Sequence, residues 1–292
     1  MSDPGPPIQA DPGVDVARIA ARAHERDRYL SALLAPRAAR EDLIALAAFA
    51  GEVARIPPMV SEPMMGEIRL QWWRDTLNLP PGVDSGHPVA DRLRAAVTRR
   101  NLPAGLLAGF IDAHRVALYN DLLPDEPALH AYLARTEGAL FELALRILGR
   151  HDATAHAVSG AAGLAYGLAR TLTELPALLS QGRTLIPESR LALAGLSLAE
   201  LTAPSTPDGT ATRVAALIRE IIRDARRALA EVRRLAARLN RAQRVAILPV
   251  ALVEPYLRSL EGSVQDPLRI TPVLTPLQRI WPLWRAYWSG RL

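Results

Sequence analysis

The chain of 292 residues contains no cysteine and no lysine, so all 35 of its basic residues are arginine. The absence of cysteine excludes disulfides, thiolate metal sites and a cysteine nucleophile, and it fits a cytoplasmic protein. The absence of lysine excludes Schiff-base chemistry and the lysine of a phosphate-binding loop. Aromatic residues make up only 5% of the chain. No run of about 18 uncharged apolar residues occurs, so we expect no membrane-spanning helix.

The chain carries a formal net charge of +5, but its arginines are interleaved with acidic residues and form no single basic block. Nucleic-acid binding is therefore not expected, because such an interface gathers basic and aromatic residues on one face. The positive charge suits phosphates or an anionic lipid surface instead. We expect a cytoplasmic protein, and attachment to the surface of the inner membrane stays open.

Apolar residues make up 49% of the chain and recur at three- and four-residue spacing almost throughout. This period predicts an all-α protein with one helical domain over residues 15–292. Residues 1–14 are rich in proline, glycine and aspartate and lack the features of a secretory signal, so they are predicted to form a disordered tail. The predicted helices are 15–35, 38–55, 62–77, 89–100, 103–121, 127–149, 153–180, 188–200, 210–238, 241–261 and 274–288.

Two of the predicted helices carry short patterns of small residues, arginine and proline. Residues 163–187 read GLAYGLARTLTELPALLSQGRTLIP, and residues 46–58 read LAAFAGEVARIPP. Both segments resemble the metal-binding helices of the squalene/phytoene synthase family. The positions that match the family pattern are Gly163, Ala165, Gly182, Arg183 and Pro187 in the first segment, and Ala48 and Phe49 in the second. Residues 24–46 and 61–77 resemble one branch of that family, which includes a mitochondrial assembly factor for respiratory complex I.

The resemblance covers roughly residues 20–260 and implies an isoprenoid-synthase-like helical bundle around a central apolar cavity. In the active family members, two helices face each other across this cavity and present aspartates that hold Mg²⁺. The Mg²⁺ ions hold the leaving diphosphate while two isoprenoid diphosphates are joined head to head. We therefore expect residues 38–55 and 153–180 to run side by side, with Ala54 and Glu174 facing one cavity.

The acidic positions of both patterns are nearly empty in this sequence. Glu174 stands at the first acidic position of the second pattern, and the remaining acidic positions hold Ala54, Arg55, Pro58, Ala177 and Leu178. A carboxylate–cation pair at 4 Å is worth about 4 kcal/mol at an effective dielectric near 20, so one carboxylate will not hold a Mg²⁺ cluster against water. We therefore predict no catalytic residue, no metal ligand and no cofactor. Mg²⁺ is expected only if the protein is an enzyme.

The arginines near these positions can bind a phosphate directly, without a metal ion. The predicted ligand-binding residues are Arg55, Arg170, Glu174, Arg183, Phe49 and Tyr166. For Glu174 an alternative stays open, because Arg170 lies four residues earlier and the two side chains can pair on one helix face.

The sequence therefore predicts a non-catalytic protein of squalene/phytoene synthase type. Its expected partners are an isoprenoid diphosphate or another lipid, a protein of a respiratory complex whose assembly it assists, or a membrane surface. The alternative is a prenyltransferase that condenses two farnesyl or geranylgeranyl diphosphates head to head.

Five tryptophans fall in two places. Trp72 and Trp73 are adjacent in one predicted helix, so one is expected in the core and the other at a pocket wall or a partner. Trp281, Trp284 and Trp288 follow helical spacing near the C-terminus and are predicted to cap the core. The open alternative is that this stripe lies at a membrane interface, where the amphipathic side chains of tryptophan and arginine are favoured.

Overall fold

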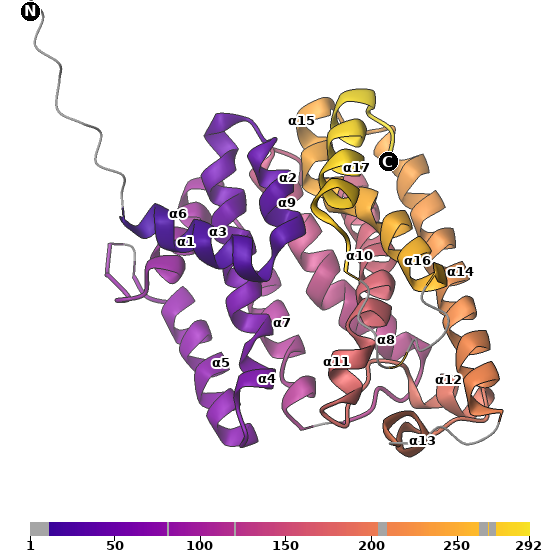
Figure 1. Cartoon of the computed structure of the whole chain (residues 1–292). Coiled ribbons are helices and arrows are strands. Elements are labelled where there is room, and N and C mark those ends of the chain that lie inside the picture. The colour runs from indigo at the N-terminus through magenta and orange to yellow at the C-terminus, as the bar shows by residue number, and fades with distance from the viewer. Residues whose placement is uncertain (1–11, 81, 120, 204–208, 263–267, 269–272) are drawn as a thin grey trace, which may run out of the picture.

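The computed structural model describes residues 12–80, 82–119, 121–203, 209–262, 268 and 273–292, with side chains from residue 16 onward. Over these residues its regular structure consists of helices alone, which confirms the all-α prediction (Figure 1). The α-helices are α1 Pro12–His24, α2 Arg26–Leu33, α3 Arg37–Ala54, α4 Ile56–Met59, α5 Pro63–Leu77, α6 Pro88–Arg100, α7 Ala104–Ala113, α8 Glu126–Leu133, α9 Ala139–Ile147, α10 Ala153–Thr173, α11 Leu175–Leu179, α12 Glu188–Leu193, α13 Leu198–Thr202, α14 Thr210–Ala236, α15 Arg241–Arg244, α16 Val253–Gly262 and α17 Pro276–Ser289. Two 3₁₀ segments, η1 Val116–Leu118 and η3 Val245–Leu252, and one π-helical turn, η2 Ala134–Gly138, complete them.

The predicted tail over residues 1–14 falls mostly on residues 1–11, which lie outside the described residues. Helix α1 begins at Pro12, so the helical chain starts slightly earlier than predicted. Within the described ranges, every helix is too short or too polar to cross a bilayer.

Several predicted helices are interrupted where the backbone leaves the α-helical conformation. The prediction of one continuous helix over 15–35 is wrong at Glu25, whose φ of −131° and ψ of 54° separate α1 from α2. The predicted helix 153–180 divides between α10 and α11, and Pro176 lies in the first turn of α11. The predicted helix 241–261 includes η3, which contains Pro249; proline lacks the amide that a continuous α-helix needs.

Helices α10 and α14 form the largest packed pair of the fold and run together through one half of the molecule (Figure 1). Helix α14 buries one stripe against α10, including Leu217, Ile221, Ile222, Leu229 and Val232, and its arginines lie on the other face. In the other half, α3 packs against α1, α2 and α6. This arrangement leaves the C-terminal end of α3 and the C-terminal end of α10 facing a shared cavity.

Two tryptophan predictions have different outcomes. Trp73 is buried and packs edge-on against Phe49, whereas its neighbour Trp72 is 38% exposed, as expected for adjacent helical residues. The prediction that the stripe of Trp281, Trp284 and Trp288 caps the core is wrong, because about half of each side chain is exposed. Helix α17 instead buries the opposite face, which carries Leu283 and Ala286.

Gly163 allows an unusually close approach between α10 and η2. A Cβ atom added to Gly163 would lie 2.6 Å from both the backbone nitrogen and the Cα atom of Gly138. Real Cβ contacts are not this short, and backbone atoms cannot move aside as a flexible side chain can. The glycine at this position therefore fixes the depth at which η2, with Glu137, sits against α10.

We expect Gly163→Ala to lower the free energy of unfolding by about 3 kcal/mol, the upper end of ordinary overpacking costs, because the new methyl group meets backbone. Gly160→Ala is the matched control, since it lies on the same helix and its added Cβ meets nothing within 4 Å. That control should be neutral or stabilise the protein by up to about 1 kcal/mol. Urea unfolding measures both; equal stability of the two variants would contradict the close contact.

Candidate functional site

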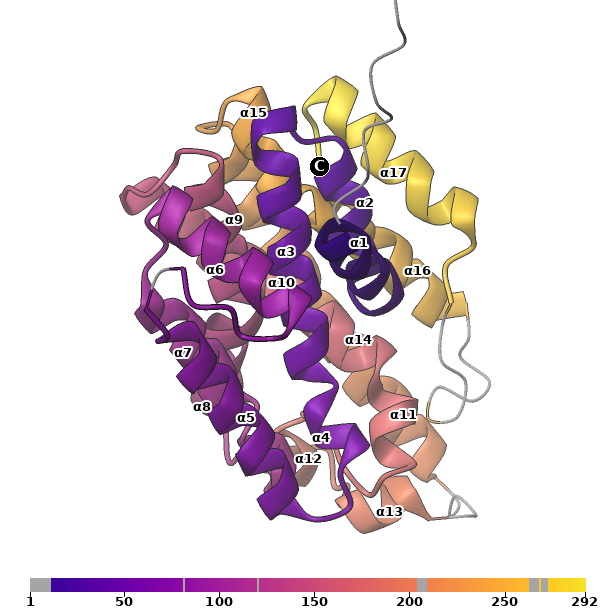
Figure 2. The ribbon, with the colours of Figure 1, turned by 90° about the vertical axis from the view of Figure 1, so that its left-hand side faces the viewer.

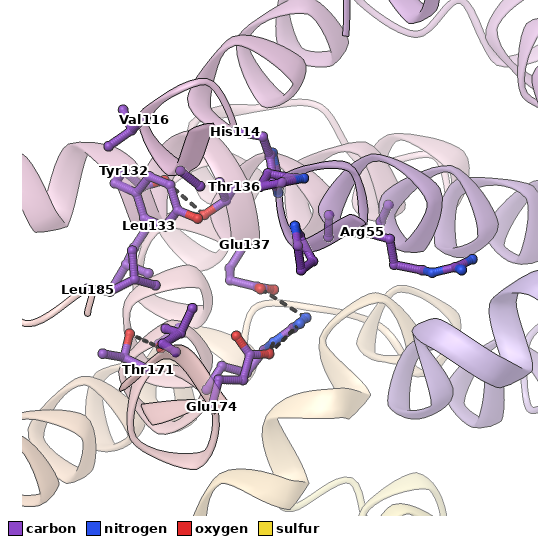
Figure 3. A pocket seen from close by; sticks show the side chains of 18 of the residues that line it. Arg55, His114, Val116, Tyr132, Leu133, Thr136, Glu137, Thr171, Glu174 and Leu185 are labelled. Atoms are coloured by element: carbon purple, nitrogen blue, oxygen red, sulfur yellow. Dashed lines mark hydrogen bonds and ion pairs between the residues drawn. The ribbon is translucent and has the colours of Figure 1, made fainter. Parts of the chain in front are cut away.

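A cavity of about 470 Å³ lies where the two family-like segments meet. Ala54 at the end of α3 and Glu174 after α10 both line it, which confirms that these two positions face one cavity. The prediction that the two helices run side by side is wrong, because α9 packs against both α3 and α10 and these two make little direct contact. The other positions that are acidic in the family pattern also line it, namely Arg55, Pro58, Ala177 and Leu178. Figure 3 shows Arg55 and Glu174 on different sides of this space.

Apolar and aromatic side chains form much of the remaining wall. They come from α7, α8, α9, η1 and the loop after α11, and they include Phe110, Val116, Tyr132, Leu133, Leu140 and Leu185. Burial raises the pKa of the Tyr132 hydroxyl well above its usual range, so this wall stays uncharged. The cavity therefore combines an apolar wall with a cluster of charged groups.

Arg170 lies at the centre of that cluster and contacts three carboxylates from three different elements. Its guanidinium nitrogens lie 2.7 Å from Glu25, 3.2 Å from Glu137 and 2.6 Å from Glu174. Arg28 approaches from α2 and lies 2.5 Å from Glu137 and 3.3 Å from Glu25. Figure 3 shows the carboxylates of Glu137 and Glu174 pointing toward one another across these ion pairs.

Burial and the two arginines together shift the pKa values of Glu25 and Glu137 in opposite directions. Burial raises the pKa of the Glu25 carboxyl above its ordinary value, although Arg170 and Arg28 oppose the shift. Burial also opposes ionisation of Glu137, but the attraction of the two guanidinium groups outweighs it and lowers the pKa. Arg170 loses hydration as well, yet its carboxylate partners raise its pKa well above the usual range. Arg170 is therefore a permanent internal cation, and Glu25 takes up a proton before Glu137 as the pH falls.

Two further arginines line the cavity outside this cluster. Arg55 Nη1 lies 2.8 Å from Nε2 of His24 and 3.8 Å from Glu52. Burial and the nearby Arg55 lower the pKa of His24, so the neutral ring accepts this hydrogen bond. Arg183 donates to the carbonyl oxygen of Ala117, and within the described chain it makes no ion pair. Of the cavity arginines, Arg183 is therefore the one least neutralised by protein groups.

Phe49 and Tyr166, the two aromatic residues predicted to contact a ligand, lie in the core and do not line the cavity. The Phe49 ring packs 5.2 Å from Trp73 and 5.3 Å from Phe110, the latter a wall residue. The Tyr166 hydroxyl donates a hydrogen bond of 2.8 Å to Asp27. Phe49 therefore packs behind a residue of the cavity wall, whereas Tyr166 holds Asp27 in the core.

Sequence reasoning missed four residues that organise the site: His24, Glu25, Arg28 and Glu137. Three of them belong to the charged run HERDR over residues 24–28, which lies between apolar helical stretches. A charged run in such a context is a signal for buried ion pairs, because unpaired charges are costly to bury. Glu137 carries no comparable local signal.

The residues of this cavity do not fit a Mg²⁺ cluster. Alanine, proline and leucine stand at most of the acidic positions and supply no oxygen ligands. The carboxylates that face the cavity around Arg170 already form ion pairs with its guanidinium. Across the described residues, no three metal-binding side chains are grouped in a way that holds a metal ion. The positive charge that a metal supplies elsewhere is here part of the protein.

The sequence model of the squalene/phytoene synthase family matches residues 21–290. The protein therefore belongs to the squalene/phytoene synthase family. Among curated proteins, it is 33% identical over 177 residues to NADH dehydrogenase (ubiquinone) complex I, assembly factor 6 of Bos taurus, and 31% identical over 181 residues to the human protein of that name. Each match covers 60% of this chain and 53% of the relative, so the chain spans about half the length of the curated relatives it matches.

Solved structures show the same fold. The crystal structure of squalene synthase HpnC from Alicyclobacillus acidocaldarius aligns with a TM-score of 0.70 and 20% identity, over 89% of this chain and 97% of that one. A dehydrosqualene synthase in complex with a ligand aligns with a TM-score of 0.76 and 13% identity, over 96% and 97% of the two chains. These likenesses confirm the isoprenoid-synthase-like helical fold.

Removing the guanidinium from the cluster should create a weak metal site. In Arg170→Asn, three carboxylates lose their shared partner, and we expect a lower melting temperature that millimolar Mg²⁺ partly restores. Hard oxygen ligands are what Mg²⁺ prefers. Arg146→Asn is the matched control, because Arg146 pairs with the single carboxylate Glu142. Thermal unfolding with and without Mg²⁺ measures the effect. A Mg²⁺ response of the unaltered protein would contradict the role assigned to Arg170.

Glu137→Gln should destabilise the protein by about 3 kcal/mol at neutral pH, because the buried Arg28 and the partly buried Arg170 lose a partner. The folded pKa of Glu137 lies below its ordinary value of 4.5. The stabilisation that ionised Glu137 provides is therefore complete at a pH above that value, and it is lost as the pH falls through the folded pKa. Chemical denaturation at several pH values measures the free energy of unfolding of both proteins. The difference between the variant and the unaltered protein should become smaller at acidic pH. Glu231→Gln, which breaks an exposed pair with Arg234, is the matched control and should leave the free energy of unfolding nearly unchanged at any pH, because solvent screens such a pair.

Proposed function

We propose that this protein is a non-catalytic member of the squalene/phytoene synthase family that binds a lipid in its cavity and assists the assembly of a respiratory complex. The observation that carries the non-catalytic assignment is the guanidinium of Arg170 at the centre of three cavity carboxylates. Head-to-head condensation requires metal ions to stabilise a leaving diphosphate. Here Glu25, Glu137 and Glu174 already form ion pairs with Arg170 when no ligand is bound.

The charges of the cavity favour a ligand that carries little negative charge. Arg170 is shared among carboxylates, so only Arg55 and Arg183 remain to meet an anionic head group. A diphosphate without Mg²⁺ would bring several negative charges close to Glu174 and Glu137, which repel it. A long apolar chain suits the wall formed by α7, α8 and α9. An isoprenoid lipid with a small anionic or polar head group therefore fits better than a free diphosphate.

The assembly role rests on the curated relatives. Proteins named as assembly factor 6 of complex I share about a third of their residues with this chain over the matched part. A protein partner among the subunits or assembly proteins of a respiratory NADH dehydrogenase is the corresponding proposal here. Deleting the gene in its own host should reduce the amount of assembled NADH dehydrogenase on native gels, and normal assembly would reject this part of the proposal.

Ligand binding can be tested by calorimetry with an unreactive farnesyl diphosphate analogue and with farnesyl monophosphate. We expect the monophosphate to bind at least as tightly as the diphosphate analogue, and Mg²⁺ not to strengthen either. Arg183→Gln should weaken binding about tenfold or more, because a hydrogen bond to a charged group is worth about 1.5–3 kcal/mol. Arg223→Gln on the exposed face of α14 is the matched control and should bind as the unaltered protein does.

The alternative, a prenyltransferase, is supported by the carboxylates Glu25, Asp121, Glu137 and Glu174 that face the cavity. Incubation with farnesyl or geranylgeranyl diphosphate and Mg²⁺, followed by product analysis, separates the two functions. Formation of a squalene- or phytoene-type product, or tight binding that depends on Mg²⁺, would reject the non-catalytic proposal.

A further inference from the structure

Helix α17 is attached to the rest of the fold by one face only. Its Leu283 and Ala286 are buried, and it contacts α2 and η3. Arg279 forms an ion pair with the buried carboxylate of Asp27 and donates to the hydroxyl of Tyr256 at 2.8 Å. These contacts fix the rotation of the helix about its axis, so the opposite face is held outward.

The outward face of α17 is a continuous apolar stripe. Its members follow helical spacing and are at least 46% exposed: Leu277 73%, Ile280 51%, Trp281 55%, Trp284 46% and Trp288 60%. The rings of Trp281 and Trp284 stack with their centroids 5.3 Å apart. Figure 2 shows α17 along one outer edge of the molecule. Isolated apolar residues on a surface are ordinary, but a stripe with three tryptophans on one helix indicates a binding face.

The charged side chains on the segment that carries this stripe are all basic. Residues 273–292 contain no aspartate or glutamate, and Arg285 and Arg291 are exposed among the tryptophans. Arg241 of α15 lies over the rings of Tyr287 and Trp288, 4.8 Å and 4.6 Å from their centroids. A smaller cavity of about 170 Å³ opens beside the end of α17, with Arg241 and Arg244 on its wall and apolar side chains around them.

We propose that the stripe of α17, with the arginines beside its C-terminal end, docks on the surface of an anionic phospholipid bilayer. Tryptophan rings are suited to the boundary between head groups and acyl chains. Arginine binds lipid phosphates, and each arginine near an anionic surface strengthens attachment about fivefold. The cavity beside Trp288 has a size and a charge that suit one head-group phosphate.

The same charges argue against a second copy of the chain as the occupant. A symmetric contact through this face would bring Arg285 and Arg291 of both copies together, and like charges across an interface oppose association. The bilayer surface supplies negative charge along the whole stripe. This inference is independent of the ligand and the partner proposed above, because none of its residues lines the larger cavity.

The experiment is co-sedimentation of the full chain with phosphatidylcholine vesicles, with and without phosphatidylglycerol. We expect binding to the mixed vesicles that weakens at high salt, and little binding to phosphatidylcholine alone. Arg285→Gln with Arg291→Gln should weaken binding to the mixed vesicles more than tenfold. The double variant Trp284→Ser with Trp288→Ser should abolish binding. The unaltered protein should show a blue shift of tryptophan fluorescence when it binds the mixed vesicles, and this double variant should show none.

The matched control is Ile68→Ser with Trp72→Ser, two similarly exposed apolar residues on α5, and it should bind as the unaltered protein does. Circular dichroism and the melting temperature establish that each variant is folded. The proposal is overturned by equal binding to both vesicle types, by binding that survives the tryptophan changes, or by loss of binding in the α5 control. Concentration-dependent self-association that the tryptophan changes remove would assign the face to a second copy and would also overturn it.

Discussion

The site depends on one partly buried cation, the guanidinium of Arg170. An arginine taken out of water loses hydration that only close and well-placed carboxylates can replace. Glu25, Glu137 and Glu174 supply that replacement from α1–α2, η2 and the end of α10. Because these elements are distant in the chain, the same ion pairs that keep Arg170 charged also hold the walls of the cavity together. The positive charge placed there by the protein occupies the carboxylates that would otherwise be available to a metal ion.

The position of the acids depends in turn on small residues. Glu137 lies in the π-helical turn Ala134–Gly138, whose extra residue per turn changes the direction of the side chains that follow. Gly163 lets α10 approach this turn at backbone distance. A larger residue at Gly163 would separate the carboxylate of Glu137 from both of its arginines. This chain keeps the glycine of the family pattern at Gly163 although it has lost most of the acidic residues of that pattern, which fits a role in packing rather than in chemistry.

Structural features that depend on residues close together in the sequence could be predicted. Features that depend on contacts between distant residues could not. Helical periodicity placed nearly every helix, and the four-residue spacing of Arg170 and Glu174 predicted a pair that is confirmed at 2.6 Å. Glu25 reaches Arg170 from 145 residues away, so no local spacing reveals that contact. The prediction that the α17 tryptophans cap the core is wrong because that helix is apolar on two faces. Periodicity identifies such faces but not which of them is covered.

The charged segment 24–28 connects the cavity to the C-terminal helix. His24 meets Arg55 of α3, Glu25 meets Arg170 of α10, and Arg28 meets Glu137 of η2. Asp27 accepts from two tyrosines and pairs with Arg279 of α17. The non-helical backbone at Glu25 is what allows neighbouring residues to point toward such different elements. Because Glu25 and Asp27 lie within one turn, this short segment is held by ion pairs to the cavity helix α10 and to the C-terminal helix α17 at the same time.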